Sequence, residues 1–456
     1  MDAAPPAVAD PVTVAKFGGS SLASADQIRK ARAIVEADPR RRFVVPSAPG
    51  KRTPGDRKVT DLLYFCHEAA GQGVAFDEAF AIVDDRFRGI TDELGVDLDL
   101  DTLLGEVKAG IAQHAAAGRG PDFAASRGEY LNGRVMAALL GWPFYDPAEG
   151  IVFTAAGRFD PKATYAPLGE ALRALGRAVV PGFYGRTPDG YVKTFSRGGS
   201  DVTGAVVARA IGAAVYENWT DVSGLLMTDP RVVDSPETIE SLTYRELREL
   251  SYMGATVLHP EAVFPVREAG IPVNIRNTNA PDDPGTRIVA TEDAAPSRRP
   301  VTGIAGRKDF TVIHLEKALM NEVIGYGEQV LGILRRQGVS FEHMPSGIDT
   351  LSIVVSDEEL DGKIDLLVEQ LNRDIQPDAI EVDPDLALIA TVGRGMKTQP
   401  GRAARLFTAL ADAGVNIRMI DQGSSELNII VGVNVNDFDT ALRAIYAAFM
   451  DGPGVH

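Results

Sequence analysis

The sequence predicts an α/β protein: a sheet covered by helices on both faces, followed by two smaller β-α-β-β-α-β units. Three observations support this prediction. Short apolar runs alternate with helical patterns through the first two thirds of the chain, two strand-to-helix turns carry Gly-Gly pairs, and the last third runs through one order of strands and helices twice. Ligands of open α/β sheets bind at the carboxyl ends of the strands, so the glycine turns mark the expected site.

Length and composition narrow the class of protein. The 456 residues predict two to three domains, and a net charge of −17 argues against a nucleic-acid-binding surface. Cys66 is the only cysteine, so no intrachain disulfide is possible and a cytoplasmic protein is expected. Neither a signal peptide nor an apolar run of membrane-spanning length occurs, and the six histidines lack metal-ligand spacing.

The first glycine turn follows a strand near the amino terminus. The strand around Val14 ends at Lys16, then Gly18 and Gly19 follow, and a capping box at Ser24 opens a helix. Free backbone N–H groups and a helix N-terminus favour an anion, and a lysine ammonium suits a phosphate in transfer. The turn matches neither the Walker A motif nor the dinucleotide fingerprint. A plain β-to-α turn with a surface lysine is the alternative.

The second glycine turn is Arg197-Gly198-Gly199-Ser200-Asp201, before a helix expected from Val202 to Ile211, which Ser200 or Asp201 can cap. The guanidinium of Arg197 suits a carboxylate. Two such turns aimed at one site could hold the two anions of a phosphoryl transfer, one the donor phosphates and one an acidic acceptor. Ordinary helix capping is the alternative.

The other helices and strands expected in the first two thirds of the chain are less clearly marked in the sequence. We expect a strand over Arg42–Ser47, a polar loop to Asp56, a helix from Lys58, mostly helix over 68–118, and a helix beginning at Ser126 that presents Glu129 early. Further short strands are expected at Phe144–Tyr145, Ile151–Phe153, Ala178–Val180, Val215–Trp219 and Ile271–Arg276. Thr228-Asp229-Pro230-Arg231 is either a nucleotide clamp or a surface turn, and 277–300 is interpreted as a linker.

The last third predicts two related units. The first contains strands Phe310–Glu316, Ser340–Met344, Thr350–Val355 and Ala379–Val382, with helices Val323–Gln337 and Asp357–Asn372. The second contains strands Leu386–Val392, Val415–Ile420 and Leu427–Val433, with helices Arg402–Ala413 and Phe438–Phe449. The second unit is one strand short. The apolar run Val301–Ala305 lies before the first unit, and we infer that it closes the second sheet, so that the first unit is inserted in the second.

Together these stretches resemble aspartate kinase, of the amino-acid-kinase family, with two ACT domains. The matching motifs span nearly the whole chain in the family's order; they are Lys16-Phe17-Gly18-Gly19-Ser20-Ser21, Val59-Thr60-Asp61, Gly128-Glu129, Arg197-Gly198-Gly199-Ser200-Asp201, Thr220-Asp221-Val222, Thr228-Asp229-Pro230-Arg231, Val257-Leu258-His259-Pro260 and Gln422-Gly423-Ser424-Ser425-Glu426. The resemblance implies an amino-acid-kinase-like αβα sandwich over 11–290, a ferredoxin-like ACT domain over 308–383, and a second one formed by 301–307 with 384–450.

The resemblance also implies a reaction: ATP and L-aspartate give 4-phospho-L-aspartate and ADP, the first step toward the aspartate-family amino acids. Lys16 would meet the γ-phosphoryl group and Asp201 would orient the site. The aspartate would be bound by Thr60, Glu129, Arg197, Gly198, Gly199 and Ser200, with Arg197 on its α-carboxylate and Glu129 on its amino group. ATP, with its Mg²⁺, would be held by Lys16, Gly18, Gly19, Ser20, Thr220, Asp221, Leu226 and Arg231.

One position departs from the family pattern. Many members carry a lysine before Val-Leu-His-Pro, where this chain has Thr256. Arg231 or Lys193 then compensates, or ATP binds more weakly. Lys51-Arg52 either reaches the phosphates or is solvated.

The ACT pair implies an amino-acid effector, lysine or threonine or both, bound at an interface between subunits of a homodimer or larger homo-oligomer. Its pocket would use Met320, Gly325, Tyr326, Glu342 and Ser346. The alternative is that the ACT pair only holds a dimer together. For the whole chain, the alternatives are a kinase for glutamate or N-acetylglutamate, and a catalytically idle amino-acid sensor.

Overall fold

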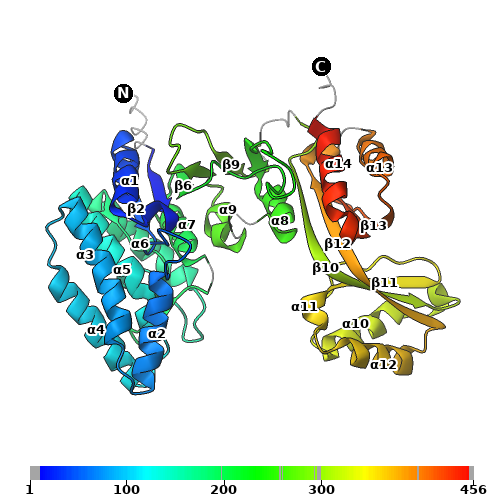
Figure 1. The fold of residues 1–456 in the computed structure, drawn as a ribbon, viewed down its shortest axis with the longest axis horizontal. Helices are drawn as coiled ribbons and strands as arrows, with labels where there is room; N and C mark the ends of the chain where they lie inside the picture. Colours follow the sequence, from blue (N-terminus) through cyan, green and yellow to red (C-terminus); the bar gives the residue numbers. More distant parts are fainter. Residues whose placement is uncertain are drawn as a thin grey trace, which may run out of the picture. The chain divides into compact units, whose positions relative to one another are not determined.

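The structure is a computed structural model that describes residues 11–450 except 197, 256, 257, 259, 292, 295–298, 398 and 399 (Figure 1). Its contacts divide the chain into two compact units, each described by itself below. The first unit comprises Met1–Leu225, Thr238–Tyr244 and Val257–Ala294, and the second comprises Leu226–Glu237, Arg245–Thr256 and Ala295–His456. The fold class is therefore α/β, as the alternation of strands and helices predicts.

The first unit is built on a seven-stranded, mostly parallel sheet. Its strands lie in the order β3 (Ala178–Val179), β2 (Arg41–Pro46), β1 (Thr13–Phe17), β6 (Val215–Thr220), β8 (Val273–Asn277), β9 (Thr286–Val289) and β7 (Ser241–Thr243). Its helices are α1 (Ala25–Ala37), α2 (Val59–Gly71), α3 (Asp77–Leu94), α4 (Leu100–Ala116), α5 (Asp122–Leu140), α6 (Pro161–Leu175), α7 (Gly199–Ile211) and α9 (Phe264–Glu268). A hairpin of β4 (Tyr184–Arg186) and β5 (Val192–Thr194) lies apart from this sheet.

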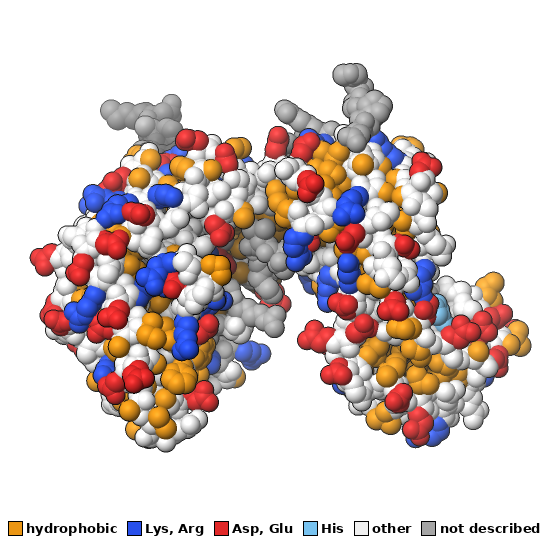
Figure 2. All heavy atoms as spheres, in the orientation of Figure 1, with side chains coloured by type: hydrophobic (Ala, Val, Ile, Leu, Met, Phe, Trp, Pro, Cys, Tyr) orange, Lys and Arg blue, Asp and Glu red, His pale blue; other side chains and the backbone are white. Residues whose placement is uncertain are grey.

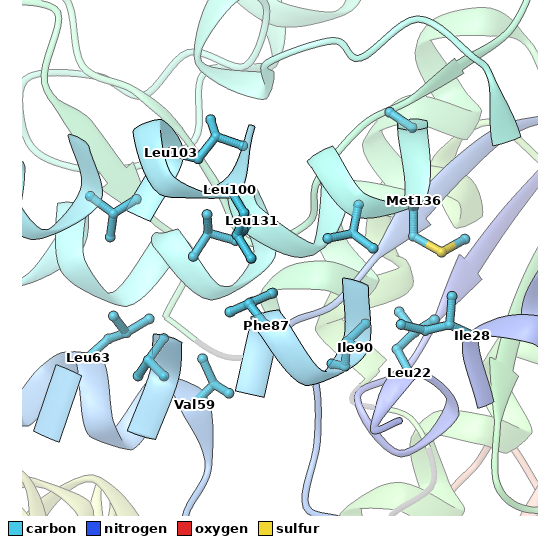
Figure 3. Packing of buried hydrophobic residues seen from close by; sticks show 14 of the residues in the cluster. Leu22, Ile28, Val59, Leu63, Phe87, Ile90, Leu100, Leu103, Leu131 and Met136 are labelled. Atoms are coloured by element: carbon cyan, nitrogen blue, oxygen red, sulfur yellow. The ribbon is translucent and has the colours of Figure 1, made fainter. Parts of the chain in front are cut away.

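The alternation of side chains along β1 separates the core from the site. Ala15 and Phe17 join a large apolar cluster with α1 to α5, part of which is seen in Figure 3. Successive side chains of a strand point to opposite faces, so Lys16 projects the other way, toward α7. One short strand thus contributes apolar side chains to the core on one face and a lysine to the site on the other.

Several expected elements of this unit have different bounds. The run 68–118 is mostly helical, as expected, but the helix expected at Ser126 begins four residues earlier, at Asp122. Phe144–Tyr145 and Ile151–Phe153 form only isolated bridges rather than strands. The linker interpretation of 277–300 is wrong for Thr286–Val289, because β9 pairs there with β8 and β7. Turn residues on both sides hide this four-residue strand in the sequence.

The second unit contains one five-stranded sheet, in the order β11 (Thr350–Ser356), β10 (Gly303–Glu316), β12 (Ala379–Val392), β14 (Asn428–Asn434) and β13 (Ile417–Asp421). Its helices are α10 (Tyr326–Arg336), α11 (Asp357–Leu360), α12 (Ile364–Ile375), α13 (Arg402–Asp412) and α14 (Phe438–Met450). Two separate apolar clusters line this sheet, one with α10 and α12 and one with α13 and α14. The two repeats therefore keep separate cores.

The early apolar run pairs as we infer from the sequence. Gly303, Ile304 and Ala305 lie antiparallel to Ala390–Val392 of β12, the half of β12 that also pairs with β14. The separation into two sheets is wrong, however, because β10 and β12 run through both repeats as continuous 14-residue strands. A register shift in β10 after Arg307 marks the point where the two halves meet.

The strand expected at Ser340–Met344 is absent from the described segment, which contacts β11 through single bridges. His343 bridges to Val354, and Ser346 to Leu351. The backbone N–H of Glu342 donates to Val354 O at 2.8 Å. The segment thus follows the sheet edge without forming a full ladder.

None of the described helices is both long and apolar enough to cross a membrane. On the face shown in Figure 2, Lys and Arg side chains are interspersed with Asp and Glu. Such mixing is typical of a solvated surface.

A buried carboxylate ties α8 (Tyr244–Tyr252) to the sheet of the second unit. Glu246 is fully buried and accepts hydrogen bonds from Thr302 Oγ1 at 2.6 Å and from the Arg394 backbone N–H at 3.0 Å. The Arg394 guanidinium lies 3.3 Å from its other oxygen. Removing one partner of a buried ion pair leaves the other charge uncompensated.

We therefore expect Glu246→Ala to lower the free energy of unfolding of the second unit by about 3–5 kcal/mol. Both tryptophans, Trp142 and Trp219, lie in the first unit, so their fluorescence reports that unit alone. In the variant, the urea midpoint measured by far-UV circular dichroism should fall. The midpoint measured by tryptophan fluorescence should not change. The exposed Glu369→Ala serves as the control. Equal urea midpoints for the two variants would contradict this prediction.

Candidate active site

The core of the candidate site is a triangle of Lys16, Asp201 and Asn218. Lys16 Nζ lies 2.6 Å from Asp201 Oδ1 and 3.3 Å from Asn218 Oδ1, and Asn218 Nδ2 donates to Asp201 Oδ1 at 2.8 Å. Lys16 and Asn218 are register partners on the parallel strands β1 and β6, so their side chains share one face of the sheet. Asp201 reaches them from the first turn of α7. The structure thus joins the two glycine turns through an ion pair.

The first glycine turn is closely packed rather than left-handed. Gly18 N–H donates to Trp219 O at 2.9 Å, and Gly19 O accepts the N–H of Gly50 at 2.8 Å. A Cβ on Gly50 would lie 2.6 Å from Gly19 O, so only glycine allows this approach of the two backbones. Ser20 begins a short 3-10 turn, Ser20–Leu22, which separates the glycines from α1.

Capping of α1 is confirmed, because Ser24 Oγ accepts the N–H of Gln27. The Gln27 side chain, however, bonds to Asn279 rather than closing the capping box. The 3-10 turn Ser20–Leu22 thus lies between the first glycine turn and the capped N-terminus of α1.

The second glycine turn leads directly into α7. Gly198 is the N-cap residue with φ 55°, a left-handed conformation that favours glycine, and no side chain caps the helix. The prediction that Ser200 or Asp201 caps is wrong, since both lie inside the first turn. Ser200 is buried, and a Cβ on Gly182 would lie 2.5 Å from its Oγ. Arg197 lies outside the described residues, so its contact with a carboxylate remains a prediction.

Glu129 lies deep inside the first unit, in the middle of α5 rather than at its start. Burial raises the pKa of the Glu129 carboxyl from 4.5 to about 8, against the lowering effects of the Ala48 backbone and of the Arg127 and Lys16 charges. Its Oε2 has no hydrogen-bond partner among the described residues. One turn later, Asn132 Nδ2 donates to Ser47 O at 2.6 Å and its Oδ1 is likewise unpaired within the described residues. Two unpaired buried acceptors on one helix suit an ammonium ligand.

Thr60 is the second residue of α2 and is half-buried. The start of α2 packs against α5 at Gly128, where a Cβ would lie 2.8 Å from Ala48 Cβ and 3.3 Å from Val59 Cγ1. The helix that carries Thr60 is thereby held beside the helix that carries Glu129.

The residues predicted to hold ATP fall into both compact units. Thr220 ends β6 in the first unit, and its hydroxyl donates to Asp221 at 3.1 Å. Leu226 and Arg231 belong to the second unit, where Arg231 pairs with Asp229 at 2.7 Å. Their shared role in nucleotide binding remains a prediction.

Lys193 is one of the two residues expected to compensate for Thr256. It instead forms an ion pair with Asp122 at 3.1 Å. Thr256 itself lies outside the described residues. Arg52 is paired with Asp56 at 2.9 Å, and Asp56 also holds the buried Arg86 at 2.8 Å. Arg86 in turn donates to Gly50 O at 3.1 Å, so this network fixes the loop that touches Gly19.

The predicted effector residues lie in the first repeat of the second unit. Met320 and Tyr326 are buried in its core, and Gly325 caps α10 with φ 83°. Glu342 is half-buried and Ser346 is exposed. Beside them, Leu319, Val323, Ile324 and Ile348 are exposed apolar side chains, Ile324 by 98%. Because Met320 and Tyr326 lie in the core, the exposed surface of this segment is formed by the side chains around them.

Sequence reasoning missed Asn218 and Asn132. The sequence signal at Asn218 was weak, because the strand Val215–Thr220 also contains Glu217 and Thr220, and the polar Asn218 does not stand out among them. Asn132 lies three residues after Glu129, which places both on one helix face. Within the described residues, no group of three or more His, Cys, Asp or Glu side chains could hold a metal ion.

Comparison with known proteins shows the family of this chain. The amino acid kinase family model matches residues 11–277, more than half of the chain, and an ACT domain model matches 389–449. Aspartokinase 3 of Bacillus subtilis is 39% identical over 457 residues, covering 96% of this chain and 99% of that protein.

Solved structures are similar over the same span. The crystal structure of Clostridium acetobutylicum aspartate kinase matches with a TM-score of 0.92 and 52% identity, covering 96% of this chain and all of that one. Escherichia coli aspartokinase III, solved with aspartate and ADP, matches with a TM-score of 0.71 and 26% identity, covering 96% of this chain and 99% of that one. The same enzyme has been solved with lysine and aspartate. The chain belongs to the amino acid kinase family, among the aspartokinases that carry C-terminal ACT domains.

Proposed function

We propose that this protein transfers the γ-phosphoryl group of ATP to the β-carboxylate of L-aspartate, giving 4-phospho-L-aspartate and ADP. The observation that carries the proposal is the Lys16–Asp201 ion pair of 2.6 Å, which lies where the two glycine turns meet. The relatives named above are aspartokinases, and one was solved with aspartate and ADP. The product begins the aspartate-family biosynthetic routes.

The acceptor needs no general base, because its carboxylate is already ionised at neutral pH. Catalysis therefore depends on positioning and on charge neutralisation. Lys16 meets the transferred group beside the turn of Gly18 and Gly19, where the N–H of Gly18 is already bonded to Trp219 O. Glu129 accepts the substrate ammonium and Arg197 its α-carboxylate. Mg²⁺, bound with ATP, lowers the charge of the donor phosphates.

The direct test is coupled ADP release with aspartate, with glutamate, with N-acetylglutamate and with no acceptor. Turnover with aspartate alone supports the proposal. Turnover with glutamate or N-acetylglutamate alone would assign a different kinase of the family, and no acceptor-dependent turnover would indicate an idle sensor. The intact contacts of Lys16 favour the enzyme over the sensor.

We propose that the ACT repeats make the enzyme responsive to lysine, threonine or both. Millimolar effector should reduce turnover, and a coupling free energy of about 1–3 kcal/mol corresponds to roughly a 5- to 150-fold change in apparent affinity. Escherichia coli aspartokinase III solved with lysine supports lysine as the first candidate. Initial rates at fixed aspartate, with each aspartate-family amino acid added in turn, check this. Flat activity across the series would leave the repeats an assembly role only.

We further propose that two copies assemble through the first repeat, with the effector between them. The exposed apolar side chains of Leu319, Val323, Ile324 and Ile348 support this surface. The Leu319 N–H donates to Asp349 Oδ1 at 2.9 Å, which joins the 319–324 segment to the loop that carries Ile348. Light scattering of the wild type and of Ile324→Asp measures the assembly. We expect a dimer or larger assembly for the wild type and a smaller one for the variant.

A further inference from the structure

We propose that Asn218 is a positioning residue for phosphoryl transfer, acting through Lys16 and Asp201; this inference rests on the function proposed above. Asn218 is 4% exposed in the middle of β6, a place where apolar side chains are usual. Its neighbours Glu217 and Trp219 point to the opposite face, where Trp219 joins the apolar cluster. A buried amide at this position needs partners for both of its ends.

The two partners fix the orientation of the amide. An ammonium group can only donate and a carboxylate can only accept, so Oδ1 must face Lys16 and Nδ2 must face Asp201. The measured distances, 3.3 Å and 2.8 Å, fit this assignment. Asn218 thus contacts both members of the ion pair without adding a charge of its own.

The contacts of Lys16 Nζ with Asp201 and Asn218 also determine which of its three N–H donors is left for a ligand. An ammonium group has three donors. One faces Asp201 Oδ1 and one faces Asn218 Oδ1, which leaves one for a ligand. The Nζ atom lies 3.7 Å from the position that a Cβ on Gly18 would take, so the ammonium lies beside the first glycine turn. Asn218 therefore holds the ammonium so that its free donor is available to a phosphoryl group at that turn.

Strand β6 holds the other member of the pair at two points. Tyr216, two residues earlier on the same face, donates from its hydroxyl to the backbone O of Asp201 at 3.1 Å. Asn218 donates to the side chain of the same residue. With its backbone and its carboxylate both tied to β6, Asp201 has little freedom to follow Lys16 when a phosphate competes for the ammonium. The lysine can then shift toward the phosphate while its counter-ion stays in place.

The test replaces Asn218 in two ways. Asn218→Leu keeps the size of the side chain and removes both hydrogen bonds. We expect kcat to fall by about 10- to 100-fold, while KM for aspartate changes less than twofold, because the amide touches no substrate. Asn218→Asp puts a second carboxylate beside Asp201 and Lys16. Its kcat, measured at saturating aspartate, should rise as the pH is lowered and one of the two carboxylates is protonated, a pH dependence of kcat that the wild type lacks.

The matched control is Asn428→Leu. Asn428 is also a buried strand residue, and its Nδ2 donates to Glu249 Oε2 at 2.7 Å in the second unit. This variant loses a comparable amide–carboxylate bond, so its Tm should fall as much as that of Asn218→Leu, with kcat unchanged. An equal loss of kcat in both leucine variants, or full turnover in Asn218→Leu, would overturn the positioning role.

Should Asn218→Leu fail to fold, the pH profile of Asn218→Asp decides, and a profile parallel to the wild type would refute the inference. Wild-type turnover with aspartate is measured first. Its absence would remove the proposed function itself, whereas normal turnover in the Asn218 variants would remove only the role of this residue.

Discussion

Lys16→Met should abolish turnover, with kcat reduced about 10³-fold or more. The variant keeps an apolar stem of similar length and removes the ammonium that lies beside Gly18. Losing a single preorganised donor at the transferred group costs about 10²–10³ in rate, and losing a charged donor costs more. KM values should change far less than kcat, because the interaction strengthens only as charge develops on the phosphoryl group. Steady-state ADP release measures both constants.

A second variant separates this effect from stability. Lys16→Met leaves the Asp201 carboxylate, whose side chain is 20% exposed, without its ion-pair partner, so Tm should fall. Lys16→Met combined with Asp201→Asn removes that unpaired charge and should recover Tm without recovering turnover. The exposed pair of Lys108 and Asp77 offers the control, because Lys108→Met should change neither quantity. Substantial turnover in the folded Lys16→Met protein would refute the role assigned to this lysine.

The sequence predicts the parts of the site that depend on local chemistry. Gly-Gly pairs after short strands, with Lys16 before one and Asp201 after the other, are visible as spacing, and the parallel sheet brings both turns to one edge. The role of Asn218 could not be predicted from local spacing, because it depends on the register between β1 and β6. Lys16 and Asn218 are 202 residues apart in the sequence. The burial of Glu129 is hidden for the same reason. Local spacing shows a carboxylate near a helix start, whereas tertiary packing, in which the neighbouring Gly128 lies against Ala48 and Val59, places Glu129 in the interior.

In the fold, too, local sequence predicts some features, whereas others depend on tertiary packing. Alternation and caps place most helices, and the unpaired run before the first repeat predicts its pairing with β12. The continuity of β10 and β12 could not be predicted, because Asp309, Pro384 and Asp385 are residues typical of turns. In the structure Asp309 and Asp385 adopt left-handed φ values of 73° and 62° where the two halves of the sheet meet, so these residues bend the long strands instead of ending them.

Glu129→Gln should raise KM for aspartate by about 100-fold and remove the pH dependence of that constant. Burial holds the pKa of the Glu129 carboxyl at about 8, so the group is mostly protonated at neutral pH. A substrate ammonium binds the ionised form, so binding releases a proton below that pKa. In the wild type KM should therefore fall by up to about tenfold per pH unit between about pH 6 and pH 8, and level off above. In the variant the profile should be flat, with kcat less affected than KM.

The same substitution should stabilise the protein, which separates a binding role from a structural one. The pKa of Glu129 is higher in the folded chain, about 8, than the ordinary 4.5, so the folded state binds more protons between these values. Its contribution to stability is fully present below pH 4.5 and is lost as the pH rises through 8. Glu129→Gln carries no such loss, so its Tm should exceed that of the wild type at pH 8 and approach it near pH 4.5. Exposed Glu68→Gln should alter neither KM nor the pH dependence of Tm. A buried carboxylate that lowers stability and is needed only to bind an ammonium is expected at a substrate site. A Glu129→Gln variant with lower Tm and unchanged KM would instead make Glu129 a packing residue.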